Sequence, residues 1–132
     1  MALQILVVDD SQIMRNTMKS VFGKMKIACE FLEADDGVEA LELLTHEHVE
    51  LVLLDWNMPK LSGLDFLKQV RAMDKYKKLP IIMVTSKTAR ANVIEAIQNG
   101  VSDYITKPIN IDLFIDKLTR LPLFSAYKKN NT

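Results

Sequence analysis

Short apolar runs alternate along the chain with longer segments in which apolar residues recur at helical spacing. Five runs are apolar almost throughout, at 3–8, 27–32, 51–54, 79–84 and, more weakly, 101–106. Strands that are covered on both faces of a sheet have this composition. The runs therefore predict five buried β-strands.

The segments between and after these strands have the spacing of amphipathic helices, with apolar residues three or four positions apart. Their apolar stripes are Met14, Met18, Val21, Phe22 and Met25; Val38, Leu41 and Leu44; Leu64, Leu67 and Val70; Val93, Ile94 and Ile97; and Ile111, Phe114, Ile115 and Leu118. Ser11 and Asp36 have side chains that can cap the first two helices, and Gly100 follows the fourth, where a left-handed residue often ends a helix.

Five strands that alternate with five helices predict a parallel sheet, because each helix returns the chain across the sheet. We expect an α/β fold, a (βα)5 doubly wound three-layer sandwich with a five-stranded parallel sheet. A chain of 132 residues fits one domain with a single core. The hydrophobic periodicity does not determine the strand order.

Composition narrows the classes of partner and compartment. Seventeen basic and seventeen acidic residues cancel, so the charge does not favour nucleic-acid binding. No apolar run approaches the ~20 residues of a membrane span, and the first residues lack the pattern of a secretion signal. Cys29 is the single cysteine, which suits a reducing compartment and a small core side chain. We expect a cytoplasmic protein that binds neither nucleic acid nor membrane, with His46 and His48 on its surface.

Polar side chains follow four of the five predicted strands: Asp9 and Asp10, Asp55, Thr85, and Lys107. In an open parallel sheet, ligands bind beyond the carboxyl ends of the strands, so these groups should converge. Carboxylates ~4 Å apart repel by roughly 4 kcal/mol per pair at an effective dielectric constant of about 20. A hard divalent cation removes this penalty, and an all-oxygen ligand set suits Mg²⁺.

Such a site suits phosphoryl transfer, in which catalysis consists mostly of positioning and charge neutralisation. Asp55 can act as a nucleophile that forms an aspartyl phosphate. Lys107 can neutralise the phosphoryl group, and the Thr85 hydroxyl can donate to one of its oxygens. Each residue alone also has an ordinary explanation as a turn, a cap or a surface charge. Their combination at one edge predicts a functional site.

Segments 5–11, 54–59, 84–85 and 107–108, together with Gly63, resemble the receiver domains of two-component response regulators. The resemblance extends to about residue 120 and is strongest to stand-alone chemotaxis members. It implies the flavodoxin-like strand order 2-1-3-4-5, a receiver domain over residues 1–121, and a tail at 122–132 without an output domain. It also implies a monomeric signalling protein rather than an enzyme.

The resemblance also implies how a phosphoryl group is bound. Asp55 would accept it from a sensor histidine kinase. Asp9, Asp10, Asp55 and the backbone carbonyl of Asn57 would bind Mg²⁺, with Asp10 and Asp55 as direct ligands and Asp9 acting through water. Lys107-Pro108 matches a position at which the family usually has a cis peptide bond.

The same resemblance implies a switch. Thr85 and Lys107 would sense the phosphoryl group, and Tyr104 would rotate inward to fill the space that Thr85 leaves. The surface of the fourth helix, fifth strand and fifth helix would then bind a downstream protein, such as the flagellar motor switch. A phosphatase would be a further partner.

Two features depart from the chemotaxis pattern. Lys87 is basic where those members commonly have an acidic residue, which puts the dephosphorylation rate and the phosphatase in question. The tail continues past Pro122, which should stop the last helix, and its Leu123, Phe124 and Tyr127 would pack back on the domain or contact a partner.

Three alternatives remain. The chain could serve another phosphorelay, or it could be a binding module that lost phosphorylation, although the complete acid set argues against the latter. A haloacid-dehalogenase-type phosphohydrolase also uses an Asp nucleophile, a Thr, a Lys and Mg²⁺. Those enzymes need a second Asp where this chain has Asn57, which cannot protonate a leaving group. The chain has only four scattered glycines, so a Gly-rich nucleotide loop is absent.

Overall fold

The computed structural model describes residues 2–125 and contains a five-stranded parallel sheet in the order β2-β1-β3-β4-β5. The strands are β1 (Leu3–Val8), β2 (Cys29–Ala34), β3 (Leu51–Leu54), β4 (Ile81–Thr85) and β5 (Asp103–Thr106). The helices are α1 (Gln12–Lys24), α2 (Gly37–His46), α3 (Gly63–Arg71), α4 (Arg90–Gln98) and α5 (Ile111–Thr119). Short 3₁₀ turns follow α3 and α5, at Asp74–Tyr76 and Pro122–Phe124. The predicted fold class and strand order are confirmed.

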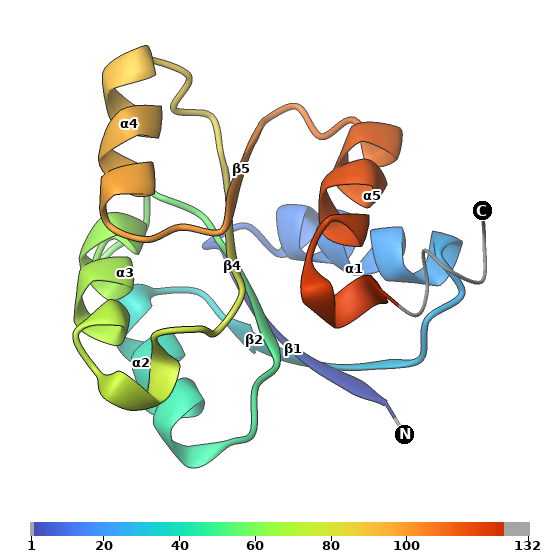
Figure 1. Ribbon diagram of the computed structural model, residues 1–132, viewed down its shortest axis with the longest axis horizontal. Helices are drawn as coiled ribbons and strands as arrows, with labels where there is room; N and C mark the ends of the chain where they lie inside the picture. The colour runs from blue at the N-terminus through green and yellow to red at the C-terminus, as the bar shows by residue number, and fades with distance from the viewer. Residues whose placement is uncertain (1, 126–132) are drawn as a thin grey trace.

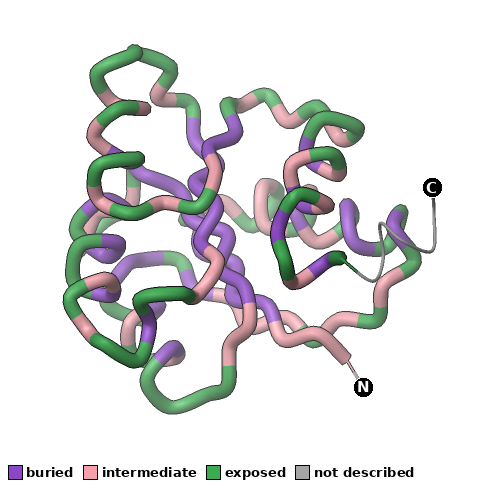
Figure 2. Tube along the Cα trace, in the orientation of Figure 1, coloured by how far each residue is buried: buried purple, intermediate pink, exposed green. Residues whose placement is uncertain are grey.

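The sheet lies between two helical layers, α2, α3 and α4 on one side and α1 and α5 on the other (Figure 1). Buried positions run along the central strands and the inner sides of the helices (Figure 2). Alternate strand residues serve the two cores: Leu6 and Val8 of β1 face the α2–α4 layer, whereas Ile5 and Val7 face α1 and α5. This alternation explains why the strand sequences are apolar throughout.

The predicted helix ends agree with the structure. Ser11 Oγ accepts a hydrogen bond from the Met14 amide, and Asp36 Oδ1 accepts one from the Glu39 amide, so both residues cap their helices. Gly100 has a φ of +93°, the left-handed conformation expected after α4. Among residues 2–125, no helix combines the length and apolar character that crossing a membrane requires.

Some predicted boundaries and faces were wrong. The structure moves β2 from 27–32 to Cys29–Ala34 and starts β4 and β5 two residues later than predicted. Pro80 falls just before β4, where its lack of an N–H has no consequence for the ladder. In α4, Ala96 is the buried residue, while Ile94 and Ile97 are exposed. Helical spacing alone thus misplaced the inward face of α4.

The segment after α5 packs back on the domain. Helix α5 ends at Thr119, and Pro122 opens the 3₁₀ turn that follows. Phe124 is 3% exposed, with its ring centroid 6.4 Å from that of Phe22 in α1. The prediction that this segment folds back therefore holds for Leu123 and Phe124, whereas Tyr127 lies outside the described residues.

Candidate functional site

Three carboxylates meet beyond the carboxyl ends of β1 and β3. One oxygen from each of Asp9, Asp10 and Asp55 lies within 4.8 Å of the other two. Asp9 is 0% exposed and Asp55 is 5% exposed, whereas Asp10 faces solvent. The sheet creates this arrangement because the neighbouring strands β1 and β3 are parallel and end at the same edge. The predicted convergence of the three acids is confirmed.

Lys107, just after β5, provides a positive charge within the cluster. Its Nζ lies 2.8 Å from Asp9 Oδ2 and 3.4 Å from Asp55 Oδ2. Burial by itself would lower the pKa of Lys107, but the hydrogen bond to Asp9 and the charges of Asp55 and Asp9 outweigh it and raise that pKa. Lys107 is therefore a cation held between two buried acids. The Lys107-Pro108 peptide bond is cis, as the resemblance implied.

Asp55 is held firmly by the backbone. Its amide donates to the Val8 carbonyl at 2.9 Å, and its Oδ1 accepts from the Trp56 amide at 2.7 Å. Burial raises the pKa of Asp55; Lys107 and the Thr85 hydroxyl oppose this rise, and the nearby Asp9 charge adds to it. The second carboxylate oxygen faces Lys107, on the side where the acids converge.

Gly63, at the start of α3, allows the loop after β3 to close over Asp55. A Cβ at this position would overlap the Asp55 carbonyl oxygen, so only glycine fits without a backbone shift. The Gly63 amide also donates to the Trp56 carbonyl at 2.9 Å. This contact fixes the course of the loop that carries Asn57.

A hollow in the surface beside the acids brings together Asp10, Asn57 and Lys87. Lys87 Nζ lies 5.7 Å from the Trp56 ring centroid. This separation is within the range of a cation–π interaction. The predicted ligand residue Asn57 thus lines the same hollow as Asp10. The basic residue Lys87 borders the same hollow.

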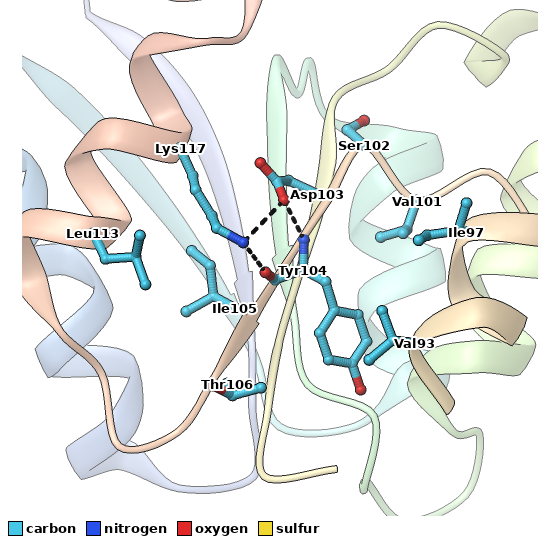
Figure 3. Close-up of a pocket in the computed structure, with 10 residues that line it drawn as sticks. All are labelled: Val93, Ile97, Val101, Ser102, Asp103, Tyr104, Ile105, Thr106, Leu113 and Lys117. Atoms are coloured by element: carbon cyan, nitrogen blue, oxygen red, sulfur yellow. Dashed lines mark hydrogen bonds and ion pairs between the residues drawn. The ribbon is translucent and has the colours of Figure 1, made fainter. Parts of the chain in front are cut away.

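Thr85 and Tyr104 lie on the two neighbouring strands β4 and β5. Thr85 is fully buried, and its hydroxyl accepts a hydrogen bond from the Lys87 amide at 3.3 Å. The Tyr104 ring lies beside Val93 of α4 (Figure 3), and its hydroxyl donates to the Lys87 carbonyl at 2.6 Å. Burial raises the pKa of Tyr104, and the charge of Asp55 adds to the rise. Tyr104 therefore already occupies an inward position in this structure.

Arg15 also contacts the site, although no pattern in the sequence pointed to it. Arg15 Nη1 donates to the Asp9 carbonyl at 2.5 Å, and Nε donates to Glu33 Oε1 at 2.9 Å. The only sequence signal was its position: Arg15 is one turn after the cap residue Ser11, and helical side chains lean toward the N-terminus of the helix.

The remaining candidates behave as expected. His46 and His48 are exposed, and His46 Nδ1 lies 2.8 Å from the Glu42 carbonyl oxygen of its own helix. Cys29 is partly buried, and burial raises its thiol pKa from 9.0 to about 11. Neither histidine belongs to the acidic cluster, and nor does the cysteine.

The cluster fits a hard divalent cation. Its donors are carboxylate oxygens from three residues that converge within bonding range of one ion, and no imidazole or thiolate of residues 2–125 joins them. Lys107 offsets one of the three negative charges, which leaves an excess of negative charge.

Residues 5–119 match the response regulator receiver domain family, and the chain belongs to that family. It is 44% identical over 117 residues to a chemotaxis protein CheY homolog of Campylobacter jejuni, covering 88% of this chain and 89% of the relative. It is 41% identical to chemotaxis protein CheY1 of Helicobacter pylori, covering 88% and 94%. The solved structure of Vibrio cholerae CheY4 superimposes with a TM-score of 0.81 at 30% identity, covering 92% of this chain and 99% of that one. The chain is therefore a CheY-type receiver domain with a signalling role.

Proposed function

We propose that this protein is a chemotaxis response regulator that accepts a phosphoryl group from a sensor histidine kinase on Asp55, with Mg²⁺ bound. The observation that carries this proposal is the position of Asp55. It is nearly buried at a strand end, 3.4 Å from the Lys107 ammonium and beside two further acids. Asp9, Asp10, Asp55 and the Asn57 carbonyl would hold the metal, which supplies positive charge to the phosphoryl oxygens.

The chain's own residues account for the transfer. An Asp55 carboxylate oxygen attacks phosphorus, and a P–O bond forms as the P–N bond to the donor histidine breaks. The electron pair of that bond stays on the imidazole nitrogen. Lys107 neutralises the phosphoryl oxygens, and the buried Thr85 hydroxyl can turn to donate to one of them. The Asn57 carboxamide cannot protonate a leaving group, which argues against the phosphohydrolase alternative.

The signal would leave through α4, β5 and α5. Lys107 and Thr85 both lie at the phosphoryl site, and Tyr104 connects to Thr85 through the Lys87 backbone. A groove on this face is bordered by Ile97 and Leu113, two exposed apolar side chains. We propose that it binds a downstream protein such as the flagellar motor switch.

At the floor of this groove, Lys117 Nζ lies 3.3 Å from Asp103 Oδ1 and donates to the Tyr104 carbonyl at 2.6 Å (Figure 3). Asp103 Oδ1 also accepts from the Tyr104 amide. The amide and the carbonyl of Tyr104, in the edge strand β5, are thus already hydrogen-bonded within the chain. A partner that inserts side chains into the groove is therefore favoured over one that pairs with β5 as an added strand.

The same proposal covers the compartment, the oligomeric state, the domain bounds and the end of the signal. We propose that the protein acts as a cytoplasmic monomer, that residues 1–121 form the receiver unit with 122–132 as a tail, and that a phosphatase ends the signal. Service in another phosphorelay is the alternative. Phosphotransfer from purified chemotaxis kinase, measured against transfer from an unrelated kinase, distinguishes the two.

Labelling with radioactive acetyl phosphate tests the phosphosite. The wild-type chain should take up Mg²⁺-dependent, alkali-labile label, and Asp55→Asn should take up none. Asp74→Asn, which neutralises an exposed acid outside the acidic groups, is the matched control and should label normally. Undiminished labelling of Asp55→Asn would show that another residue accepts the phosphoryl group.

A further inference from the structure

Arg15 of α1 is a largely buried arginine with three hydrogen bonds to partners in the chain. Its side chain is 12% exposed. Nη1 donates to the Asp9 carbonyl at 2.5 Å, Nε to Glu33 Oε1 at 2.9 Å, and Nη2 to Gln12 Oε1 at 2.6 Å. Because the guanidinium is planar, three partners fix its position more firmly than they would fix an ammonium.

Glu33, near the end of β2, anchors this arginine. Besides Arg15, its carboxylate accepts from Lys19 Nζ at 2.9 Å and from Gln12 Nε2 at 3.1 Å. The hydrogen bond from Lys19 is the main cause that lowers the pKa of Glu33, so it stays anionic at neutral pH. Three side chains of α1 are thereby tied to the edge strand next to β1.

The hydrogen bond from Arg15 to the Asp9 carbonyl affects Asp10 more than it affects the Asp9 side chain. The Asp9 side chain is already held, since Oδ1 accepts from the Ser11 amide and Oδ2 from Lys107. Within residues 2–125, no protein group donates a hydrogen bond to the Asp10 carboxylate. No such contact orients that exposed carboxylate, so its position depends on the backbone of Asp10. The amide of Asp10 belongs to the same peptide group as the Asp9 carbonyl that Arg15 holds.

We propose that Arg15, anchored by Glu33, is a positioning residue for the cation site: it fixes the peptide between Asp9 and Asp10 so that the Asp10 carboxylate faces Asp55. The inference rests on the proposed function, because it assigns a role in Mg²⁺ binding. A purely electrostatic role would have the opposite sign, since a positive charge beside a cation site weakens binding.

The opposite signs give a decisive test in the full-length chain. Mg²⁺ affinity is measured from the fluorescence of Trp56, the only tryptophan, which borders the same hollow as Asp10 and Lys87. Arg15→Met should weaken binding by about 10-fold or more, as loss of an outer partner of a metal ligand commonly does. Arg15→Lys should also weaken it, although the charge is kept. Tighter binding by Arg15→Met, or wild-type binding by Arg15→Lys, would overturn the proposal.

Two controls separate positioning from general damage. Lys24→Met removes the same charge from α1 at an exposed position, where Lys24 pairs with Asp112 at 3.5 Å, and should leave Mg²⁺ affinity unchanged. The second is metal-free hydrogen exchange at the Ser11 amide, which should speed up in Arg15→Lys more than exchange in the sheet does. If hydrogen exchange sped up equally throughout the chain, Arg15 would only stabilise the fold, and the positioning role would be wrong.

The exchange measurement also separates the two proposals. A wild-type chain that gives no Mg²⁺ response would contradict the proposed function, whereas the Ser11 amide still reports on the Arg15 contact without metal. Unchanged Ser11 exchange in both Arg15 variants would overturn the positioning role even if Mg²⁺ binds.

Discussion

Replacing Lys107 with methionine should make the metal-free protein markedly less stable and more dependent on Mg²⁺. Lys107 Nζ lies 2.8 Å from Asp9 Oδ2 and 3.4 Å from Asp55 Oδ2. At an effective dielectric constant of about 20, attraction across these separations amounts to about 6 and about 5 kcal/mol. Desolvation of the three charges offsets much of this. Removal of one partner from a buried ion pair typically costs about 3–5 kcal/mol, because it leaves the other charge buried and unpaired. We expect a loss in that range.

Urea unfolding with and without Mg²⁺ measures the effect. In Lys107→Met the divalent cation replaces the lost counter-charge for Asp9 and Asp55, so Mg²⁺ should stabilise this variant more than it stabilises the wild type. Lys24→Met, at an exposed ion pair, should change stability by less than about 0.5 kcal/mol. If Lys107→Met matched the wild type without Mg²⁺, or gained nothing from the ion, the electrostatic account of the cluster would be wrong.

Further predictions concern Phe124, Gly63 and Cys29. Phe124→Ala should lower the free energy of unfolding by about 3–5 kcal/mol in urea, because the ring is buried against Phe22; an unchanged midpoint would contradict the packing. Gly63→Ala should weaken the Mg²⁺ response, since its Cβ would overlap the Asp55 carbonyl oxygen, and a response equal to wild type would refute this. Because burial raises the pKa of Cys29 from 9.0 to about 11, its thiolate is scarcer at pH 8 in the folded chain than in the unfolded one. Iodoacetamide should therefore react about 100-fold more slowly with the folded protein than with the urea-unfolded chain, and equal rates would contradict the shift. Since the folded form binds the Cys29 proton more tightly, the protonated thiol stabilises the fold at pH values below 9.0. This contribution to the free energy of unfolding should be lost as the pH rises from 9.0 to about 11.

An acid directly after an apolar run marked the strand end at Asp9 and Asp55, but not at Glu33, which lies within β2 and pairs with Val7. β1 and β3 begin and end where the sequence predicted, because Asp9 and Asp55 mark the points at which the chain leaves the sheet. β2 was misplaced by two residues, because Ile27 is apolar but belongs to the turn before the strand, where Lys26 has a φ of +58°. Apolar character reports burial, and residues next to a strand can be half-buried without joining the ladder.

The acids, Lys107 and Thr85 could be brought together from the sequence because one topological rule places all strand ends at the same edge. Arg15 could not be found this way. A charged residue on a helix is usually solvated, and only the packing of α1 against β1 and β2 reveals that its guanidinium reaches Glu33 and the Asp9 carbonyl. Such contacts depend on how two elements pack, which a one-dimensional pattern does not encode.

The charges of the cluster predict an electrostatic role for Lys87. Asp9, Asp10 and Asp55 with Lys107 sum to about −2, which one divalent cation would neutralise. Phosphorylation would replace one carboxylate charge with about −2, and so return the pocket to about −1. Lys87, held over the Trp56 ring at the edge of the same hollow, is well placed to offset that last charge. An acidic residue at position 87 would instead add to the excess of negative charge, so Lys87 should favour the phosphorylated form.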